Sequence, residues 1–164
     1  MRRLDAGLGE QIPTLREVLD LIGGRAWLNV ELKARGTARL VADEIARAVE
    51  EGGSAWDYNR IVVSSFDHRE LALIRGNGDP RIRIGVLVAR RPVNVPKLAA
   101  RFQPQLVSLH LPARLATQAR VDRGHAAGLQ VLVFTVNDPV EIVRLRNIGV
   151  DGVFTDFPGR VGTK

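Results

Sequence analysis

The sequence predicts an α/β fold built on a parallel β-sheet. Short apolar stretches of strand length alternate with segments whose apolar residues recur at helical spacing, and this alternation continues along the whole chain of 164 residues. Such strand–helix–strand units pair their strands in parallel. The pattern leaves two arrangements open, an open doubly wound sheet and a (β/α)8 barrel. No Gly-rich phosphate fingerprint follows a strand, which weakens the dinucleotide-binding form of the open sheet.

The first helix and the first strand have recognisable boundaries. Thr14 and Glu17 have the spacing of a capping box, and Gly23 is placed to end the helix that follows them. Residues 27–33 alternate apolar and polar side chains, as a strand does. Residues 37–51 place apolar side chains at helical spacing, so we expect a helix there.

The next two units repeat this order. Residues 61–65 are typical of a parallel strand that is apolar on both faces. Asp67 is expected to cap the following helix, with Glu70 completing a second capping box. Residues 81–89 are the next predicted strand, and a short helix is expected over residues 93–101.

Three more strands complete the pattern. Residues 105–111 predict a strand and residues 115–127 a helix. Residues 129–136 form the clearest strand of the chain, and Asn137 is expected to cap the helix after it. Residues 150–156 predict the last strand, which gives six strands and six helices in alternation.

Composition restricts the class of protein. With 45% hydrophobic residues and no apolar run long enough to span a membrane, the chain is expected to be one soluble domain over residues 1–164. The basic N-terminus has no apolar run after it, so we expect no secretory signal and a cytoplasmic location. Cys is absent, which excludes thiol chemistry. The net charge of +6 is spread along the chain without basic-aromatic clusters; it suits an anionic small molecule better than nucleic acid.

Polar residues near the predicted strand ends are the candidates for a site, because both arrangements bind ligands at the carboxyl ends of the strands. Alternation places Asn29, Glu31 and Lys33 on one face of their strand. Two interpretations stay open. Glu31 and Lys33 form an ion pair that only fills the mouth of a barrel, or Glu31 is a metal ligand beside a phosphate-binding Lys33.

The other strand ends carry weaker candidates. His110 is either an acid–base group or a hydrogen-bonded residue at the rim, and Phe134 lines a pocket or packs in the core. Ser65, Asn137 and Asp156 are expected to be structural residues of the rim, with Asp156 accepting hydrogen bonds from neighbouring loops. His68 and His125 fall on predicted helices, and we expect them to lie away from the site.

Several stretches together resemble a known family. "IPTLREVLDLI", "LNVELK", "VVSSFDHREL", "GLQVLVFTVND" and "GVDGVFTDFP" occur in the same order in the glycerophosphodiester phosphodiesterases, and the resemblance extends from about Leu4 to Pro158. It implies a TIM (β/α)8 barrel as the fold. It implies an enzyme of lipid and glycerol metabolism that hydrolyses glycerophosphodiesters to glycerol 3-phosphate and an alcohol. It also implies a divalent cation, Ca²⁺ or Mg²⁺, as cofactor.

The resemblance assigns roles to individual residues. Glu31 matches a metal-binding carboxylate, and Lys33 matches a catalytic lysine near the phosphate. Phe134 matches an aromatic residue, usually Trp, that packs beside the substrate. Independently of the resemblance, His110 at its strand end is expected to help bind the substrate. The closing "TDFP", which contains Asp156, matches a strand-end motif that shapes the site.

The chain departs from the family pattern at its start. The family's His-Arg-Gly strand with a following Glu, and its Glu-x-Asp strand with a nearby His, do not occur in this sequence. We therefore expect about six of the eight βα units of a barrel, in a domain that lacks its N-terminal strands. Three explanations stay open: a reading frame started too late, a fragment whose missing strands come from another polypeptide or a second copy, and a degenerate member.

Two functions follow from this departure. The first is a metal-dependent phosphodiesterase that is inactive as this chain alone, because the N-terminal catalytic segment is absent. The alternative is a non-catalytic partial barrel that acts as an assembly or binding module. Open barrel edges would let it form a homo-oligomer.

Overall fold

The computed structural model describes residue 5 and residues 7–51, 56–89 and 94–162. The described residues form six strands and six α-helices in the predicted alternation. The strands are β1 (Leu28–Glu31), β2 (Ile61–Ser65), β3 (Arg83–Leu87), β4 (Leu106–Pro112), β5 (Gln130–Phe134) and β6 (Gly152–Val153). The helices are α1 (Leu15–Ile22), α2 (Ala38–Glu50), α3 (His68–Asn77), α4 (Val95–Phe102), α5 (Gln118–Ala126) and α6 (Pro139–Asn147). The expected start of α4 at residue 93 lies outside the described residues.

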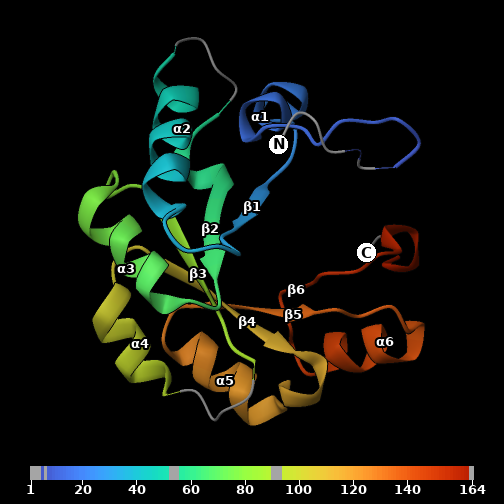
Figure 1. The fold of residues 1–164 in the computed structure, drawn as a ribbon. Coiled ribbons are helices and arrows are strands. Elements are labelled where there is room, and N and C mark those ends of the chain that lie inside the picture. Colours follow the sequence, from blue (N-terminus) through green and yellow to red (C-terminus); the bar gives the residue numbers. More distant parts are fainter. Residues whose placement is uncertain (1–4, 6, 52–55, 90–93, 163–164) are drawn as a thin grey trace.

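The strands form one parallel sheet in the order of the chain, from β1 to β6. A doubly wound sheet reverses its strand order, whereas successive units of a barrel follow one another without reversal. One cavity of about 180 Å³ is lined both by Leu28 and Asn29 of β1 and by Leu132 and Gly152 of β5 and β6. The sheet therefore curls until its two ends face each other, with the helices outside it (Figure 1). This arrangement confirms the predicted incomplete barrel.

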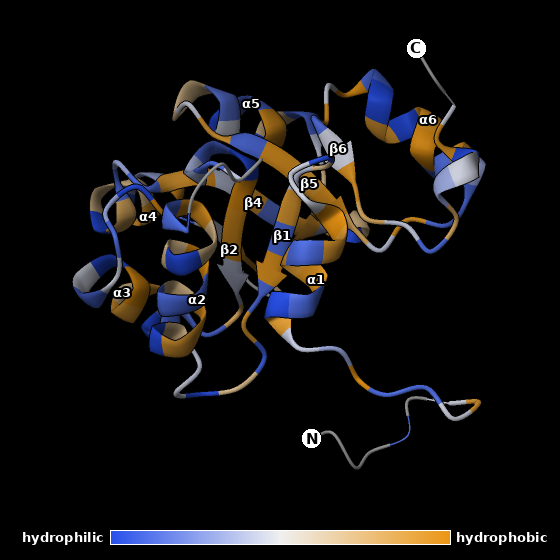
Figure 2. Ribbon diagram, turned by 90° about the horizontal axis from the view of Figure 1, so that it is seen from above, coloured by the Kyte–Doolittle hydropathy of each residue, from blue (hydrophilic) through white to orange (hydrophobic). Residues whose placement is uncertain are grey.

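The two faces of the curled sheet differ in polarity. The convex face carries aliphatic side chains such as Val63, Ile84 and Val131, which pack in the core with Leu71 and Phe102 of the helices. Figure 2 shows the strands mostly hydrophobic and the helices mixed with hydrophilic residues. Because the helices pack against the convex face, they leave the concave face uncovered, and a site can form there.

Local capping signals are largely confirmed. The Thr14 hydroxyl accepts the N–H of Glu17 at 3.2 Å, and the Glu17 carboxylate accepts the N–H of Thr14 at 2.7 Å. Gly23 ends α1 in the left-handed conformation, with φ of 52°. Asp67 caps α3 as predicted by accepting the N–H of Arg69 at 3.0 Å.

The second predicted capping box is wrong. Glu70 is buried, and its carboxylate turns away from Asp67 to accept the N–H groups of Gly36 at 2.9 Å and Ala38 at 3.0 Å. These groups begin α2, whose N-cap residue Thr37 makes no side-chain capping bond. Glu70 therefore supplies the cap of a neighbouring helix, which its own local sequence could not indicate.

The cap of α6 is also not the predicted one. Asp138, and not Asn137, accepts the N–H of Val140, at 2.9 Å. The Asn137 side chain instead forms hydrogen bonds with Asp156 in the loop after β6. No helix in the described parts of the chain has the length and apolarity that a membrane crossing needs.

Candidate active site at the carboxyl end of the sheet

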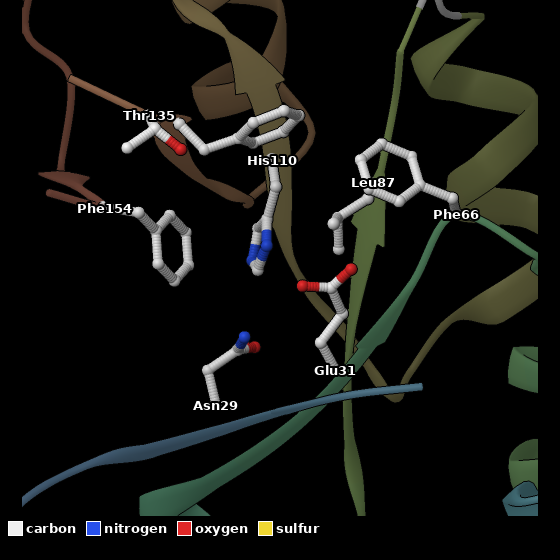
Figure 3. Close-up of a pocket in the computed structure, with 8 residues that line it drawn as sticks. Asn29, Glu31, Phe66, Leu87, His110, Thr135 and Phe154 are labelled. Atoms are coloured by element: carbon white, nitrogen blue, oxygen red, sulfur yellow. The ribbon is translucent and has the colours of Figure 1, made fainter. Parts of the chain in front are cut away.

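A pocket of about 190 Å³ opens where the strands end on the concave side. Side chains from several strands, and from the residues just after them, converge on it (Figure 3). Its lining consists of Asn29, Glu31, Phe66, Leu87, His110, Phe134, Thr135 and Phe154. The pocket thus combines the carboxylate of Glu31, the amide of Asn29 and the imidazole of His110 with an apolar wall.

Glu31 is the last residue of β1 and faces this pocket with 30% of its side chain exposed. Lys33 lies beyond the end of the strand, is 79% exposed and is not part of the lining. Its Nζ is 4.0 Å from Glu31 Oε2. A contact this long and exposed contributes under about 1 kcal/mol to stability. The structure therefore brings the two side chains near each other without holding Lys33 in place.

His110 lies inside the curled sheet, on β4, and is buried. Its Nε2 is 2.9 Å from the Ser108 hydroxyl, its Nδ1 has no hydrogen-bond partner, and its ring lies 5.2 Å from that of Phe154. Burial lowers the pKa of His110 from 6.5 to about 4. His110 is therefore neutral at pH 7 and is buried inside the sheet, deeper than the rim position that was one of its two interpretations.

The buried His110 should make the fold sensitive to acid. Between pH 6.5 and 4 the unfolded chain binds a proton at this ring and the folded chain does not, so stability falls as the pH is lowered. Over pH 7 to 5 we expect a loss of about 2 kcal/mol in the free energy of unfolding from this group alone. Urea titrations at both pH values should show this loss in the wild type relative to His110→Gln. Equal pH dependence in the two proteins would contradict it.

Aromatic rings form the apolar wall of the pocket. Phe134 at the end of β5 meets Phe66 edge to face, with ring centroids 5.6 Å apart. Phe66 follows β2 and Phe154 follows β6, so three strand ends contribute one ring each. Sequence reasoning missed Phe66, which directly follows the predicted strand 61–65, and Phe154, which lies within the predicted strand 150–156, because aromatic residues in such places are commonly core residues.

The predicted rim residues join neighbouring strand ends. The Ser65 hydroxyl donates to the carbonyl of Leu32 at 2.7 Å and accepts the N–H of Asp67 at 3.0 Å. Asn137 donates to the Asp156 carboxylate at 2.8 Å and accepts the Asp156 N–H at 3.0 Å. These bonds fix the ends of β1 and β2, and the loops after β5 and β6, around the pocket.

The two helical histidines have different surroundings. His125 pairs with Asp151 at 2.8 Å, and Asp151 also accepts the N–H of Val131 at the start of β5, away from the pocket. His68 is the first residue of α3, and its Nε2 lies 3.1 Å from the carbonyl of Leu87 at the end of β3. His68 thus lies at the carboxyl end of the sheet, because a helix that follows a strand begins there, but it is not among the residues that line the pocket.

Oxygen atoms in the pocket are of the kind that Ca²⁺ and Mg²⁺ prefer. Glu31 offers a carboxylate, and Asn29 Oδ1 is buried without a hydrogen-bond partner. The described residues contain no group of three or more His, Asp or Glu side chains that could hold a metal. The donor set therefore fits a hard cation in kind, but it supplies only part of the usual six or more ligands.

Comparisons with known proteins agree with the fold and the motifs. Residues 2–160 match the model of the Glycerophosphoryl diester phosphodiesterase family. Glycerophosphodiester phosphodiesterases of Caldanaerobacter subterraneus subsp. tengcongensis and Bacillus altitudinis are 30% and 32% identical to the chain, over 96% and 91% of its length. The chain spans 66% and 60% of these two relatives.

A solved structure adds a ligand to this comparison. An Oleispira antarctica phosphodiesterase in complex with the product sn-glycerol-3-phosphate is 30% identical, with a TM-score of 0.75. The match covers 93% of this chain and 61% of that one. The chain therefore corresponds to about three fifths of a larger relative in both sequence and structure.

Proposed function

The chain belongs to the glycerophosphoryl diester phosphodiesterase family, and from this premise we propose that the protein hydrolyses glycerophosphodiesters to sn-glycerol 3-phosphate and an alcohol. The observation that carries the proposal is the Glu31 carboxylate, which faces a pocket at the carboxyl end of a curled parallel sheet. The bound product of the Oleispira antarctica relative supports a ligand of this class.

We propose that Glu31 holds a divalent cation, Ca²⁺ or Mg²⁺, with Asn29 Oδ1 as a neighbouring oxygen ligand. Such a cation, when bound, polarises the phosphoryl group of a diester. Because the described residues supply one carboxylate to the pocket, water, substrate or other protein groups must complete the coordination. The isolated 164-residue chain should therefore bind the cation weakly and turn over slowly.

The remaining side chains act on the substrate directly. The exposed Lys33 has a flexible stem and can bring its ammonium group to the phosphoryl oxygens, where it would stabilise the charge that develops in the transition state. Phe134 and Phe66 offer an apolar wall to the carbon atoms of the substrate. His110, neutral and buried below them, can exchange a hydrogen bond with a substrate oxygen.

Metal-dependent release of glycerol 3-phosphate tests the proposal. The longest protein encoded in frame with this chain is incubated with glycerophosphodiesters that differ in their alcohol group, and the conversion of diester to monoester is followed by ³¹P NMR. We expect turnover with Ca²⁺ or Mg²⁺, loss of turnover with a chelator, and recovery when the metal is added back. Absence of turnover under all of these conditions would refute the proposed phosphodiesterase activity.

The open edges of the sheet favour the second candidate function, an assembly module. In the described sheet, β1 pairs only with β2 and β6 only with β5, so each edge presents unpaired backbone groups. Trp27, next to β1, is also largely exposed. Absence of turnover, together with a discrete oligomer in light scattering, would support this role over catalysis.

A further inference from the structure

A hydrogen-bonded pair of side chains lies on the inner face of β4, below the pocket. Ser108 and His110 are two residues apart, so both point into the curled sheet. Both are buried, with 1% of each residue exposed, and the Ser108 hydroxyl lies 2.9 Å from His110 Nε2. The other ring nitrogen, Nδ1, is buried without a partner in the described structure. Nε2 thus has a protein partner, whereas Nδ1 is a buried polar atom without one.

Gly85 of the neighbouring strand makes room for this pair. It lies opposite Ser108 in the register of β3 and β4. A Cβ at Gly85 would lie 2.8 Å from His110 Nε2 and 2.9 Å from the Ser108 hydroxyl, closer than such atoms approach. The absence of a side chain on β3 is therefore what allows the two groups to meet, and this makes the pair a specific feature of the inner face.

The surroundings of Nδ1 favour a donor over an acceptor at that position. The pocket that His110 lines already contains the Glu31 carboxylate and the unpartnered Asn29 Oδ1, both hydrogen-bond acceptors. A phosphodiester adds more acceptor oxygens. An N–H at Nδ1 would complement such acceptor oxygens, whereas a lone pair there would not.

We propose that Ser108 donates its hydroxyl hydrogen to His110 Nε2 and so keeps the ring proton on Nδ1, where the neutral ring donates a hydrogen bond to an oxygen of the bound phosphate ester. Ser108 is then a positioning residue that acts through His110. The ligand in this inference rests on the proposed function, whereas the tautomer does not. Burial keeps the ring uncharged, so it can orient a ligand oxygen without delivering a proton to it.

The tautomer can be read directly from the ring nitrogens. The described sequence contains three histidines, and their ¹⁵N–¹H long-range correlations at pH 7.5 can be assigned with His110→Gln. We expect wild-type His110 to carry its proton on Nδ1, and Ser108→Ala to shift the population to the Nε2–H form. Ser108→Thr, which keeps a hydroxyl, should retain the Nδ1–H form.

Ser64 provides a matched control. It is a buried serine at the corresponding level of β2, opposite Gly85 on its other side, and its hydroxyl has no hydrogen-bond partner in the described structure. Ser64→Ala should leave the His110 tautomer unchanged. An Nε2–H tautomer in the wild type, or an unchanged tautomer in Ser108→Ala, would overturn the proposal.

Binding of sn-glycerol 3-phosphate, measured by calorimetry in the presence of Mg²⁺, tests the ligand part separately. Loss of one well-placed donor should weaken binding about tenfold in Ser108→Ala, but not in Ser64→Ala. If Ser108→Ala changes the tautomer of His110 but binds sn-glycerol 3-phosphate as tightly as the wild type, the role of the Nδ1–H group in ligand binding is overturned. Because the NMR measurement needs no turnover, a failure of the phosphodiesterase proposal is distinguishable from a failure of this one.

Discussion

Replacing Glu31 with Gln should lower kcat/KM for glycerophosphodiester hydrolysis by about 10²-fold or more, because the change removes the carboxylate charge that a divalent cation requires while keeping the shape of the side chain. Glu31 is partly exposed at a strand end and makes only a long contact with Lys33, so the fold should be unaffected. The rate is measured as a function of Ca²⁺ or Mg²⁺ concentration, and the variant should need much more metal for any residual activity.

Asp67→Asn is a suitable control for this experiment. Asp67 is a carboxylate at the same end of the sheet, but it pairs with Arg35 at 3.2 Å and is not part of the pocket lining. Asn is as good an N-cap as Asp, so α3 should be preserved. Activity that is unchanged in Glu31→Gln, or lowered equally in both variants, would show that Glu31 is not the metal-binding carboxylate of the pocket.

Glu70→Ala should destabilise the fold by about 3 to 4 kcal/mol, the largest loss we expect from one polar residue of the chain. The buried carboxylate accepts two backbone N–H groups at the positive end of α2, and its removal leaves both of them buried or poorly solvated. Urea unfolding, followed by circular dichroism, measures the change in midpoint at a constant slope.

Two further variants make this measurement specific. Glu70→Gln keeps one acceptor and should lose less stability than Glu70→Ala. Asp43→Ala changes a carboxylate on the exposed side of α2 and should stay within about 0.5 kcal/mol of the wild type. A loss for Glu70→Ala as small as that for Asp43→Ala would mean that the tertiary cap does not stabilise α2.

Much of the fold was predictable from the sequence, since the signals involved act over a few residues. The alternation of strands and helices, the capping box of Thr14 and Glu17, and the Asp67 cap all depend on neighbours within one or two turns. The strand ends were less well predicted. The final strand was expected over residues 150–156, whereas β6 covers only Gly152–Val153.

The candidate site was predictable only in part. The alternation within "LNVELK" placed Asn29 and Glu31 on one face, and both line the pocket. The same reasoning included Lys33, but the strand ends at Glu31 and the alternation does not continue beyond it. The depth of His110 and the meeting of Phe66, Phe134 and Phe154 could not be predicted, because they depend on the curvature of the sheet.

The order of the elements, the caps of α1 and α3 and the family to which the chain belongs could be inferred without coordinates, because these reside in local spacing and in motifs. Which distant groups meet depends instead on the three-dimensional packing of the chain. Glu70 caps a helix that begins more than thirty residues before it, Asn137 binds Asp156 across two strand ends, and Gly85 admits the Ser108–His110 pair. Such contacts depend on strand register and on the curl of the sheet, and both arise only when all six strands pack together.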